Sequence, residues 1–214
     1  IVLAIGSVKI LKEQLKTVEY IAIAMLIAAV ALVGLSELSF TSSLTNFDDS
    51  GFVSRISIWS VVFAVLWFGL YYLGKRISKG KSIILAIATG FPFVLNNLWM
   101  GPLSAVLAVM GSIFDGSASS TVWIVTIISL IIIIAANVGG LIHYQFALES
   151  GNASIVVPLQ QLPQQIAPMI IFYLIYGLSS PTEFSLIAMV IAIVLITAAG
   201  FLLASRQTAL DKIK

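Results

Sequence analysis

A group of glutamines and prolines interrupts an otherwise apolar stretch in the second half of the chain. Residues 156–168 read VVPLQQLPQQIAP, within an apolar segment that extends from 153 to 176. On an α-helix the polar members and one proline fall within an arc of about 140°, and they are Gln160, Gln161, Gln164, Gln165 and Pro168. Amide side chains donate and accept hydrogen bonds without carrying charge. The pattern therefore indicates a binding surface for a neutral or zwitterionic solute.

The opposite side of this helix is apolar, and it carries Leu159, Leu162, Ile166 and Met169. We therefore expect the apolar side to meet lipid and the glutamines to point into a helix bundle. Pro158 and Pro163 are expected to break the helix or act as hinges, because each proline leaves a carbonyl one turn upstream without its usual donor. Hydrogen bonds between helices are the alternative role for the glutamines.

A second polar group lies among helix breakers in the sequence FPFVLNNLWMGP, residues 91–102. Pro92 and Pro102 are expected to kink or break this apolar segment. Asn96, Asn97 and Trp99 lie between them and are candidates for the wall of the same cavity. A place at the membrane interface or in the core is the alternative for the tryptophan.

A third polar group occurs in NVGGLIHYQFALE, residues 137–149. Asn137, Tyr144 and Gln145 share one side of a helix, within about 100° of arc, and are further candidates for substrate binding. His143 points elsewhere, and with Glu149 it is the candidate for proton coupling. A packing role is the alternative for His143.

The composition places these groups in a membrane protein. Hydrophobic residues make up 60% of the 214 residues and charged residues 9%, whereas soluble domains carry roughly 25% charged residues. There is no cysteine, so disulfides and thiolate metal sites are excluded from this sequence. No basic tract indicates nucleic acid. No HExxH motif, paired intramembrane aspartates or telling Ser–His spacing indicates an enzyme, a metal centre or a cofactor.

Six segments are long enough to cross a bilayer, which takes about 20 apolar residues, and they are 18–35, 53–73, 82–111, 121–148, 153–177 and 183–204. Residues 1–11 are expected to be the end of a further span whose beginning precedes Ile1. Runs of this length exclude the short alternating strands of a membrane β-barrel. The chain is predicted to be all-α, a polytopic bundle of transmembrane helices.

The basic residues predict the orientation of the bundle. When the connections between spans are assigned alternately to the two sides, one side carries Lys9, Lys12, Lys16, Lys75, Arg76, Lys79, Lys81, Arg206, Lys212 and Lys214. The other side carries only Arg55. Cytoplasmic loops are enriched in lysine and arginine, so we expect a protein of the cell membrane whose C-terminus is cytoplasmic.

Two spans resemble each other. TVEYIAIAMLIAAV (17–30) and PTEFSLIAMVIAIV (181–194) share Glu19/Glu183, Ile23/Ile187, Ala24/Ala188, Met25/Met189, Ile27/Ile191, Ala28/Ala192 and Val30/Val194. They start on opposite sides of the membrane, which predicts two inverted repeats of five helices: residues 1–35 end the first, which is truncated, and residues 53–205 form the second. Inverted repeats are typical of secondary transporters. Chance similarity of apolar helices is the alternative.

Two regions resemble the EamA-type repeat of the drug/metabolite transporter superfamily. They are GSVKILKEQLKTVEYIAIAMLIAAVALVGL (6–35) and QFALESGNASIVVPLQQLPQQIAPMIIFYLIYGLSSPTEFSLIAMVIAIVLITAAGFLL (145–203). The resemblance implies a ten-helix carrier whose site lies between the repeats and which moves a small metabolite or drug by alternating access. YLGKR (72–76) and NASIVVPL (152–159) are also similar to the NIPA-type magnesium transporters, which are the alternative.

The expected partners are a small-molecule substrate and the lipid bilayer, with a homodimer as a candidate assembly. An uncharged or zwitterionic substrate suits the amide-rich lining. A non-transporting membrane subunit or receptor, in which the amides are purely structural, is a further alternative.

Overall fold

The computed structural model describes residues 16–36 and 43–211, and all regular structure within them is helical. The α-helices are α2 (Thr17–Leu35), α3 (Ser50–Arg76), α4 (Lys81–Ala88), α5 (Phe91–Leu107), α6 (Met110–Phe114), α7 (Ser120–Ser150), α8 (Ala153–Met169) and α9 (Glu183–Asp211). A 3₁₀ helix, η1, spans Leu44–Asp48, and a π-helical turn, η2 (Ile170–Ile175), extends α8.

Six helical segments within the described residues are long and apolar enough to cross a membrane. They are Thr17–Leu35, Ser50–Arg76, Lys81–Leu107, Ser120–Ser150, Ile155–Ile175 and Glu183–Arg206. The predicted all-α fold and its six full spans are confirmed. The expected partial span at 1–11 lies outside the described residues.

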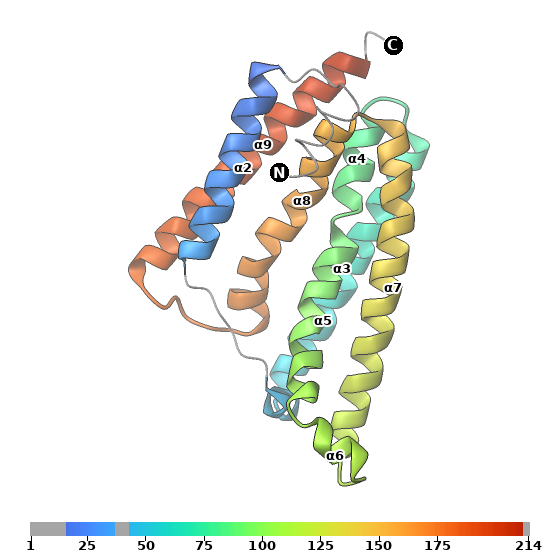
Figure 1. The fold of residues 1–214 in the computed structure, drawn as a ribbon, viewed down its shortest axis with the longest axis vertical. Coiled ribbons are helices and arrows are strands. Elements are labelled where there is room, and N and C mark those ends of the chain that lie inside the picture. Colours follow the sequence, from blue (N-terminus) through green and yellow to red (C-terminus); the bar gives the residue numbers. More distant parts are fainter. Residues whose placement is uncertain (1–15, 37–42, 212–214) are drawn as a thin grey trace.

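The central helix of the bundle is α8 (Figure 1). α2 and α9 pack together on one side of it, and α3, α4, α5 and α7 form a group on the other. The chain direction alternates from span to span, so that α2 and α9 are antiparallel while α8 runs in the same direction as α4 and α5. Both groups of helices pack against α8.

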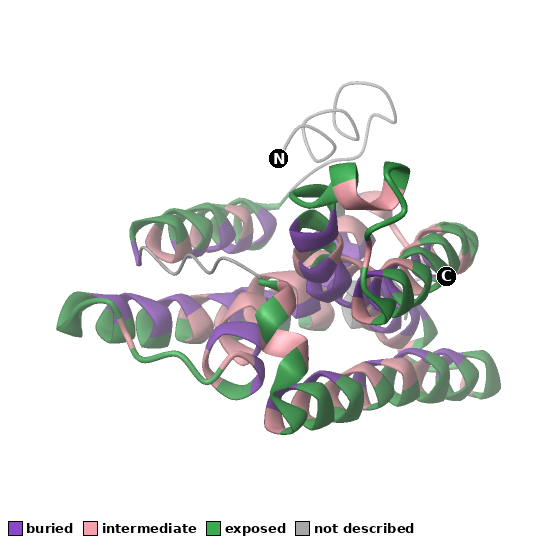
Figure 2. Ribbon diagram, turned by 90° about the horizontal axis from the view of Figure 1, so that it is seen from below, coloured by how far each residue is buried: buried purple, intermediate pink, exposed green. Residues whose placement is uncertain are grey.

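The outer faces of the long helices are apolar. Figure 2 shows burial where helices meet and exposure on the outward faces. Exposed aliphatic and aromatic side chains recur on α3 (Ile58, Val61, Val65), α7 (Ile127, Ile131, Ile134) and α9 (Val190, Val194, Phe201). An apolar surface of this extent would cause aggregation in water, whereas in a bilayer it provides the contact with hydrocarbon chains.

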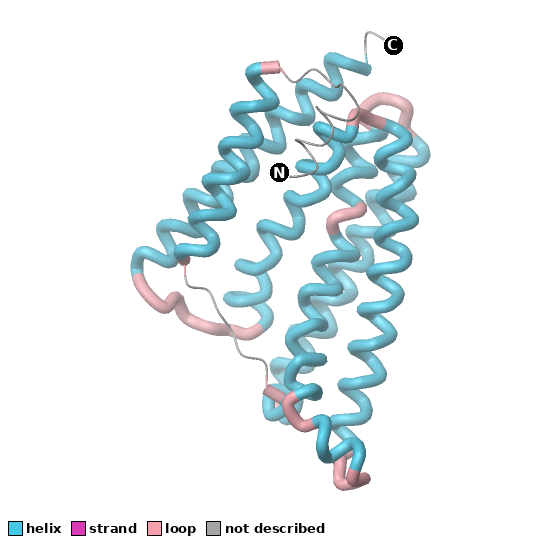
Figure 3. Tube along the Cα trace, in the orientation of Figure 1, coloured by secondary structure: helices cyan, strands magenta, loops and turns pink. Residues whose placement is uncertain are grey.

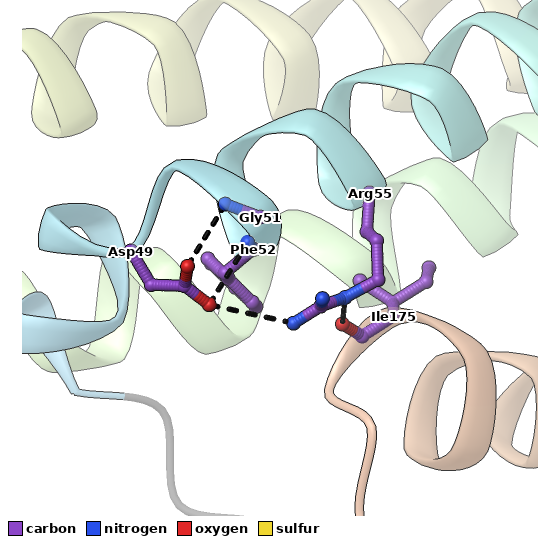
Figure 4. Close-up of polar contacts among 5 residues, drawn as sticks. All are labelled: Asp49, Gly51, Phe52, Arg55 and Ile175. Carbon is purple, nitrogen blue, oxygen red and sulfur yellow. Dashed lines mark hydrogen bonds and ion pairs between the residues drawn. The ribbon is translucent and has the colours of Figure 1, made fainter.

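Side-chain contacts fix the start of α3 and link it to the end of the fifth span (Figure 4). The Asp49 carboxylate accepts hydrogen bonds from the backbone N–H groups of Gly51 (2.8 Å) and Phe52 (3.1 Å). This is an N-cap, and it satisfies donors that have no partner within the helix. The Arg55 Nε–H donates to the Ile175 carbonyl at 2.9 Å, so α3 and η2 are joined across 120 residues of sequence.

The span from Lys81 to Leu107 is interrupted once in the middle (Figure 3). α4 ends at Ala88 and α5 begins at Phe91, with Thr89 and Gly90 between them. The break lies upstream of Pro92, as expected for a proline that lacks an N–H for the carbonyl four residues earlier. α5 continues through Pro102, so the span is not broken there, and a kink at this proline stays a prediction.

α2 and α9 pack against each other, and both helices bury alanines. The alanines that are completely buried on the two helices are Ala22, Ala29, Ala188, Ala192 and Ala199. Small side chains let membrane helices pack with short separations and more van der Waals contact. The antiparallel arrangement is the one that an inverted repeat requires.

The buried faces of α2 and α9 do not coincide at the spacing of 164 residues that aligns their sequences. Ala22 and Leu26 are buried, whereas the residues 164 positions later, Leu186 and Val190, are 52% and 53% exposed. Glu19 is 2% exposed, and its counterpart Glu183 is exposed. The inverted repeat therefore stays a prediction, and the sequence identities do not mark equivalent packing positions.

Candidate functional site

The two irregular spans of the bundle meet at Gly90. A Cβ on Gly90 would clash with the Gln160 carbonyl oxygen and would lie 2.8 Å from Pro163 Cγ. Glycine therefore permits the interruption between α4 and α5 to lie directly against α8. The crossing is within the apolar spans, about 13 Å along the helix from the start of α4. Pro163 also leaves the Leu159 carbonyl without a helical donor at this level.

Gln160 and Gln161 form an amide pair beside this crossing. Gln160 is 4% exposed, and its Oε1 accepts a hydrogen bond of 3.0 Å from Gln161 Nε2. Gln161 and Gln164 are partly buried. Gln165 is also partly buried, and its Oε1 atom is inaccessible to solvent and has no hydrogen-bond partner. A buried acceptor without a donor carries a desolvation penalty, so this atom can accept a hydrogen bond from a ligand.

The apolar side of α8 is covered by other helices only in part, so the expectation that all of it meets lipid is wrong at Leu159. Leu159 is 1% exposed within the main core cluster, where Leu162 and Ile166 also pack. Met169 is partly buried. Leu162 and Ile166 also line a groove between α3 and α9 on this side of the helix. Sequence periodicity separated the two sides of α8 but could not show which residues the neighbouring helices cover.

Asn96 and Asn137 join α5 to α7. Asn137 Nδ2 donates to Asn96 Oδ1 at 2.7 Å and to the Ile133 carbonyl at 2.8 Å. Asn97 is exposed, and its Oδ1 lies 3.5 Å from Asn96 Nδ2. The predicted asparagines therefore lie together where α5 contacts α7, and the short hydrogen bond between Asn137 and Asn96 joins the two helices.

The aromatic candidates have structural partners. Trp99 is 5% exposed, and its Nε1–H donates to Ser60 Oγ on α3 at 2.9 Å. Tyr144 packs against the main core cluster. Gln145, the neighbour of Tyr144, is exposed on α7. The structure therefore does not bring Trp99 and Gln145 to the glutamine pair.

His143 lies in an aromatic cluster between α3 and α7. Its ring stacks on Tyr71 with centroids 3.6 Å apart and planes at 6°. Its Nδ1 accepts a hydrogen bond of 2.9 Å from Trp67 Nε1, which requires a neutral ring whose proton is on Nε2. Lys75 Nζ lies 4.7 Å from the centre of the Tyr71 ring. These contacts indicate a packing role for His143. Glu149, the other candidate for proton coupling, is exposed near the end of α7.

The four predicted hinge prolines are all buried. Pro158 and Pro163 lie inside α8 without ending it, and Pro102 lies inside α5. Pro92 packs against α7 at Gly140, where a Cβ would lie 3.1 Å from the proline ring. Only Pro92 is associated with a visible interruption of its span.

Two structural features were missed from the sequence. The first is the close backbone contact at Gly90, for which a glycine two residues before Pro92 was the available signal. The second feature is an ion pair between helices: Arg206 Nε lies 3.9 Å from Glu19 Oε2, and the Lys16 backbone N–H donates to the same oxygen at 2.6 Å. No group of three or more potential metal-ligating side chains occurs among the residues that the structure describes.

No family model, no curated protein and no solved structure matches this chain. The resemblance to the EamA-type repeat therefore rests on the residues quoted above and stays a prediction. What the fold defines is a multi-pass membrane protein whose central helix carries glutamines beside a broken neighbouring helix.

Proposed function

We propose that this chain belongs to a secondary carrier of the cell membrane, which moves a small uncharged or zwitterionic metabolite or drug by alternating access. One observation carries the proposal: two irregular helices meet inside the apolar spans, at Gly90 and Pro163. Discontinuous helices with freed backbone groups form the substrate sites of many secondary transporters. Such backbone is tolerated in a membrane only where protein or water covers it.

The substrate would bind along the glutamine side of α8. The Gln160–Gln161 pair and the unpartnered Gln165 Oε1 present donors and acceptors without net charge. A solute that carries an amide, amino or hydroxyl donor would satisfy the Gln165 acceptor, which now lacks a donor. A neutral lining favours an amino acid, a nucleobase or an amphipathic metabolite over a simple ion.

The carrier would be a ten-helix protein of the EamA type, in which residues 53–205 form the second five-helix repeat. The antiparallel packing of α2 on α9 supports this arrangement. The clustering of lysine and arginine at the α3–α4 connection supports a cytoplasmic location for that end of the bundle. The C-terminus would then be cytoplasmic too, since α9 ends on the same side.

A thermal-shift screen of the full-length protein against amino acids, nucleobases and amphipathic metabolites would find ligands, because a solute that binds only the folded state raises the melting temperature. Uptake of each hit into proteoliposomes is then measured for Gln161→Leu and Gln164→Leu. We expect both to reduce uptake more than tenfold while the protein remains folded. Gln145→Leu, at an exposed position on α7, is the matched control and should transport normally.

Unchanged uptake in both α8 variants would remove the glutamines from the mechanism. If no solute shifts the melting temperature and both variants are destabilised together, the amides are structural and the protein is a non-transporting subunit or receptor. Uptake of Mg²⁺ that does not depend on the glutamines would instead favour a magnesium transporter.

A further inference from the structure

A cavity of about 550 Å³ lies on the side of α8 opposite the glutamines. Leu162 and Ile166 of α8 line its floor, α3 contributes Leu66 to one wall, and α9 contributes Thr197 and Phe201 to the other. Phe91, at the interruption between α4 and α5, also lines it. None of the glutamines lines this cavity, so it is separate from the substrate site proposed above.

The chemistry of the lining excludes a polar occupant. Thr197 and Trp59 are the only lining residues whose side chains can form hydrogen bonds. A water molecule needs two to four polar partners, and apolar cavities without them stay dry. A polar solute would lose its own hydrogen bonds with water and gain few in return.

The mouth of the cavity opens towards hydrocarbon. Its walls belong to helices that are long and apolar enough to cross the membrane. Phe201 is 76% exposed and Leu66 is 37% exposed, so the rim on both walls is apolar and accessible from the side of the bundle. The medium that reaches these residues in a membrane is the acyl-chain region of the bilayer.

The cavity is elongated along the helices. On α8 the lining residues extend from Leu159 to Ile170, a rise of about 16 Å along the helix axis. On α9 they extend from Ile196 to Ala204, about 12 Å. A single extended hydrocarbon chain has this shape, and the chains of bilayer lipids run in the same direction as membrane-spanning helices.

We propose that this groove binds one acyl chain of a membrane phospholipid, which contacts α8 between α3 and α9. The acyl chain supplies the apolar contacts that α3 and α9 do not make to each other along this groove. It reaches the central, proline-bearing helix, unlike lipids that touch only the outer faces of the bundle. The site goes beyond the proposed transport activity, and either can fail without the other because they occupy opposite sides of α8.

Photo-crosslinking tests the proposal directly. The full-length protein is reconstituted in vesicles that contain a phosphatidylcholine with a diazirine in the middle of one acyl chain, irradiated and mapped by peptide mass spectrometry. We expect labels on α8 at Leu162 or Ile166 in addition to labels on exposed positions. Labels confined to the exposed faces of α3, α7 and α9 would overturn the proposal, as expected if another protein segment, a second copy or a free apolar solute fills the groove.

Two substitutions from opposite walls, Leu66→Trp and Thr197→Trp, fill the groove independently, so that a folding defect in one leaves the other as a test. We expect each to lower labelling of α8 at least fivefold. Val65→Trp is the matched control, since Val65 is 63% exposed and lies beside Leu66 but does not line the cavity. Labelling of α8 that is equal in the control and in both filled variants would also overturn the proposal.

Discussion

Gly90 has no side chain, and this allows the Gln160 carbonyl and the Pro163 ring to lie against the interruption between α4 and α5. We expect Gly90→Ala to force these segments apart and to lower the free energy of unfolding by about 1–3 kcal/mol, as overpacking does in a close-packed interior. Denaturant unfolding in detergent measures the change. Gly69→Ala is the control, because no atom lies within 4 Å of its new Cβ, and there alanine should stabilise the helix by about 0.5–1 kcal/mol. Equal effects at the two glycines would contradict the close contact.

Asn96 and Asn137 are joined by a hydrogen bond of 2.7 Å between neighbouring membrane helices. A double-mutant cycle with Asn96→Ala and Asn137→Ala isolates their interaction. We expect a coupling energy of about 0.6 kcal/mol and at most about 1.7 kcal/mol, the range of such bonds in membranes. The same variants in an uptake assay distinguish a structural role of the pair from a role in transport. A loss of transport far larger than the loss of stability would place the pair in the substrate path. A coupling of zero would show that the bond does not form.

At the scale of elements, Arg55 ties the start of α3 to the end of the fifth span through the Ile175 carbonyl (Figure 4). We expect Arg55→Leu to lower the free energy of unfolding by about 1–2 kcal/mol, which is near or below the lower end of the range for a hydrogen bond to a charged group, because this side chain is 41% exposed. Hydrogen exchange over Ile170–Ile175 should accelerate in this variant.

Asp49→Asn separates this link from the ion pair of 3.6 Å between Arg55 and Asp49. Asparagine caps helices as well as aspartate does, and an exposed ion pair contributes about 0–1 kcal/mol. We therefore expect Asp49→Asn to change stability by less than half as much as Arg55→Leu. If the two variants behave alike, the ion pair and not the link to Ile175 is what matters.

Glu19 and Arg206 connect the two helices that lie apart from the main group. Glu19 is 2% exposed and the Arg206 side chain 14% exposed, at a separation of 3.9 Å. Arg206→Leu leaves a buried carboxylate without its counter-ion, so we expect a loss of about 3–5 kcal/mol. The double variant Glu19→Gln/Arg206→Leu removes the stranded charge and should recover most of that loss. Denaturant unfolding compares the two, and an equally unstable double variant would show that the packing of Arg206, not its charge, is important.

Hydropathy and helix period predicted the spans well because they depend on local sequence. The bounds of α2 and α7 differ little from those expected, whereas α9 continues to Asp211, beyond the expected end at 204. The break at Pro92 follows from covalent chemistry and was also predictable. What lay beyond the sequence is long-range contact. No local pattern reveals which neighbouring helices pack on the leucine side of α8, or that the Trp67 indole N–H donates a hydrogen bond to His143. Trp99 and Asn137 looked like site residues because polar groups in apolar helices are rare, and each has a partner on a neighbouring helix that satisfies it.

At the scale of the whole molecule, charge is distributed unequally between the two ends of the bundle. The start of α2, the α3–α4 connection and the end of α9 lie at one end (Figure 1), and they carry Lys16, Lys75, Arg76, Lys79, Lys81 and Arg206. Among the described basic residues, Arg55 alone belongs to the opposite end. The exposed apolar faces between the ends fit helices that cross the bilayer, and the positive-inside rule predicts that the lysine-rich end is cytoplasmic.

Labelling of single cysteines tests that direction, and the sequence is suited to it because it contains no cysteine. Ser78 in the α3–α4 connection and Ser179 between η2 and α9 are both exposed, and they lie at opposite ends of the bundle. We expect a membrane-impermeant maleimide to label Ser179→Cys in intact cells and to label Ser78→Cys only after permeabilisation. Permeabilised cells provide the control that both thiols react. The reverse pattern would place the lysine-rich end outside and contradict a cytoplasmic C-terminus, and labelling of both sites in intact cells would contradict the six spans themselves.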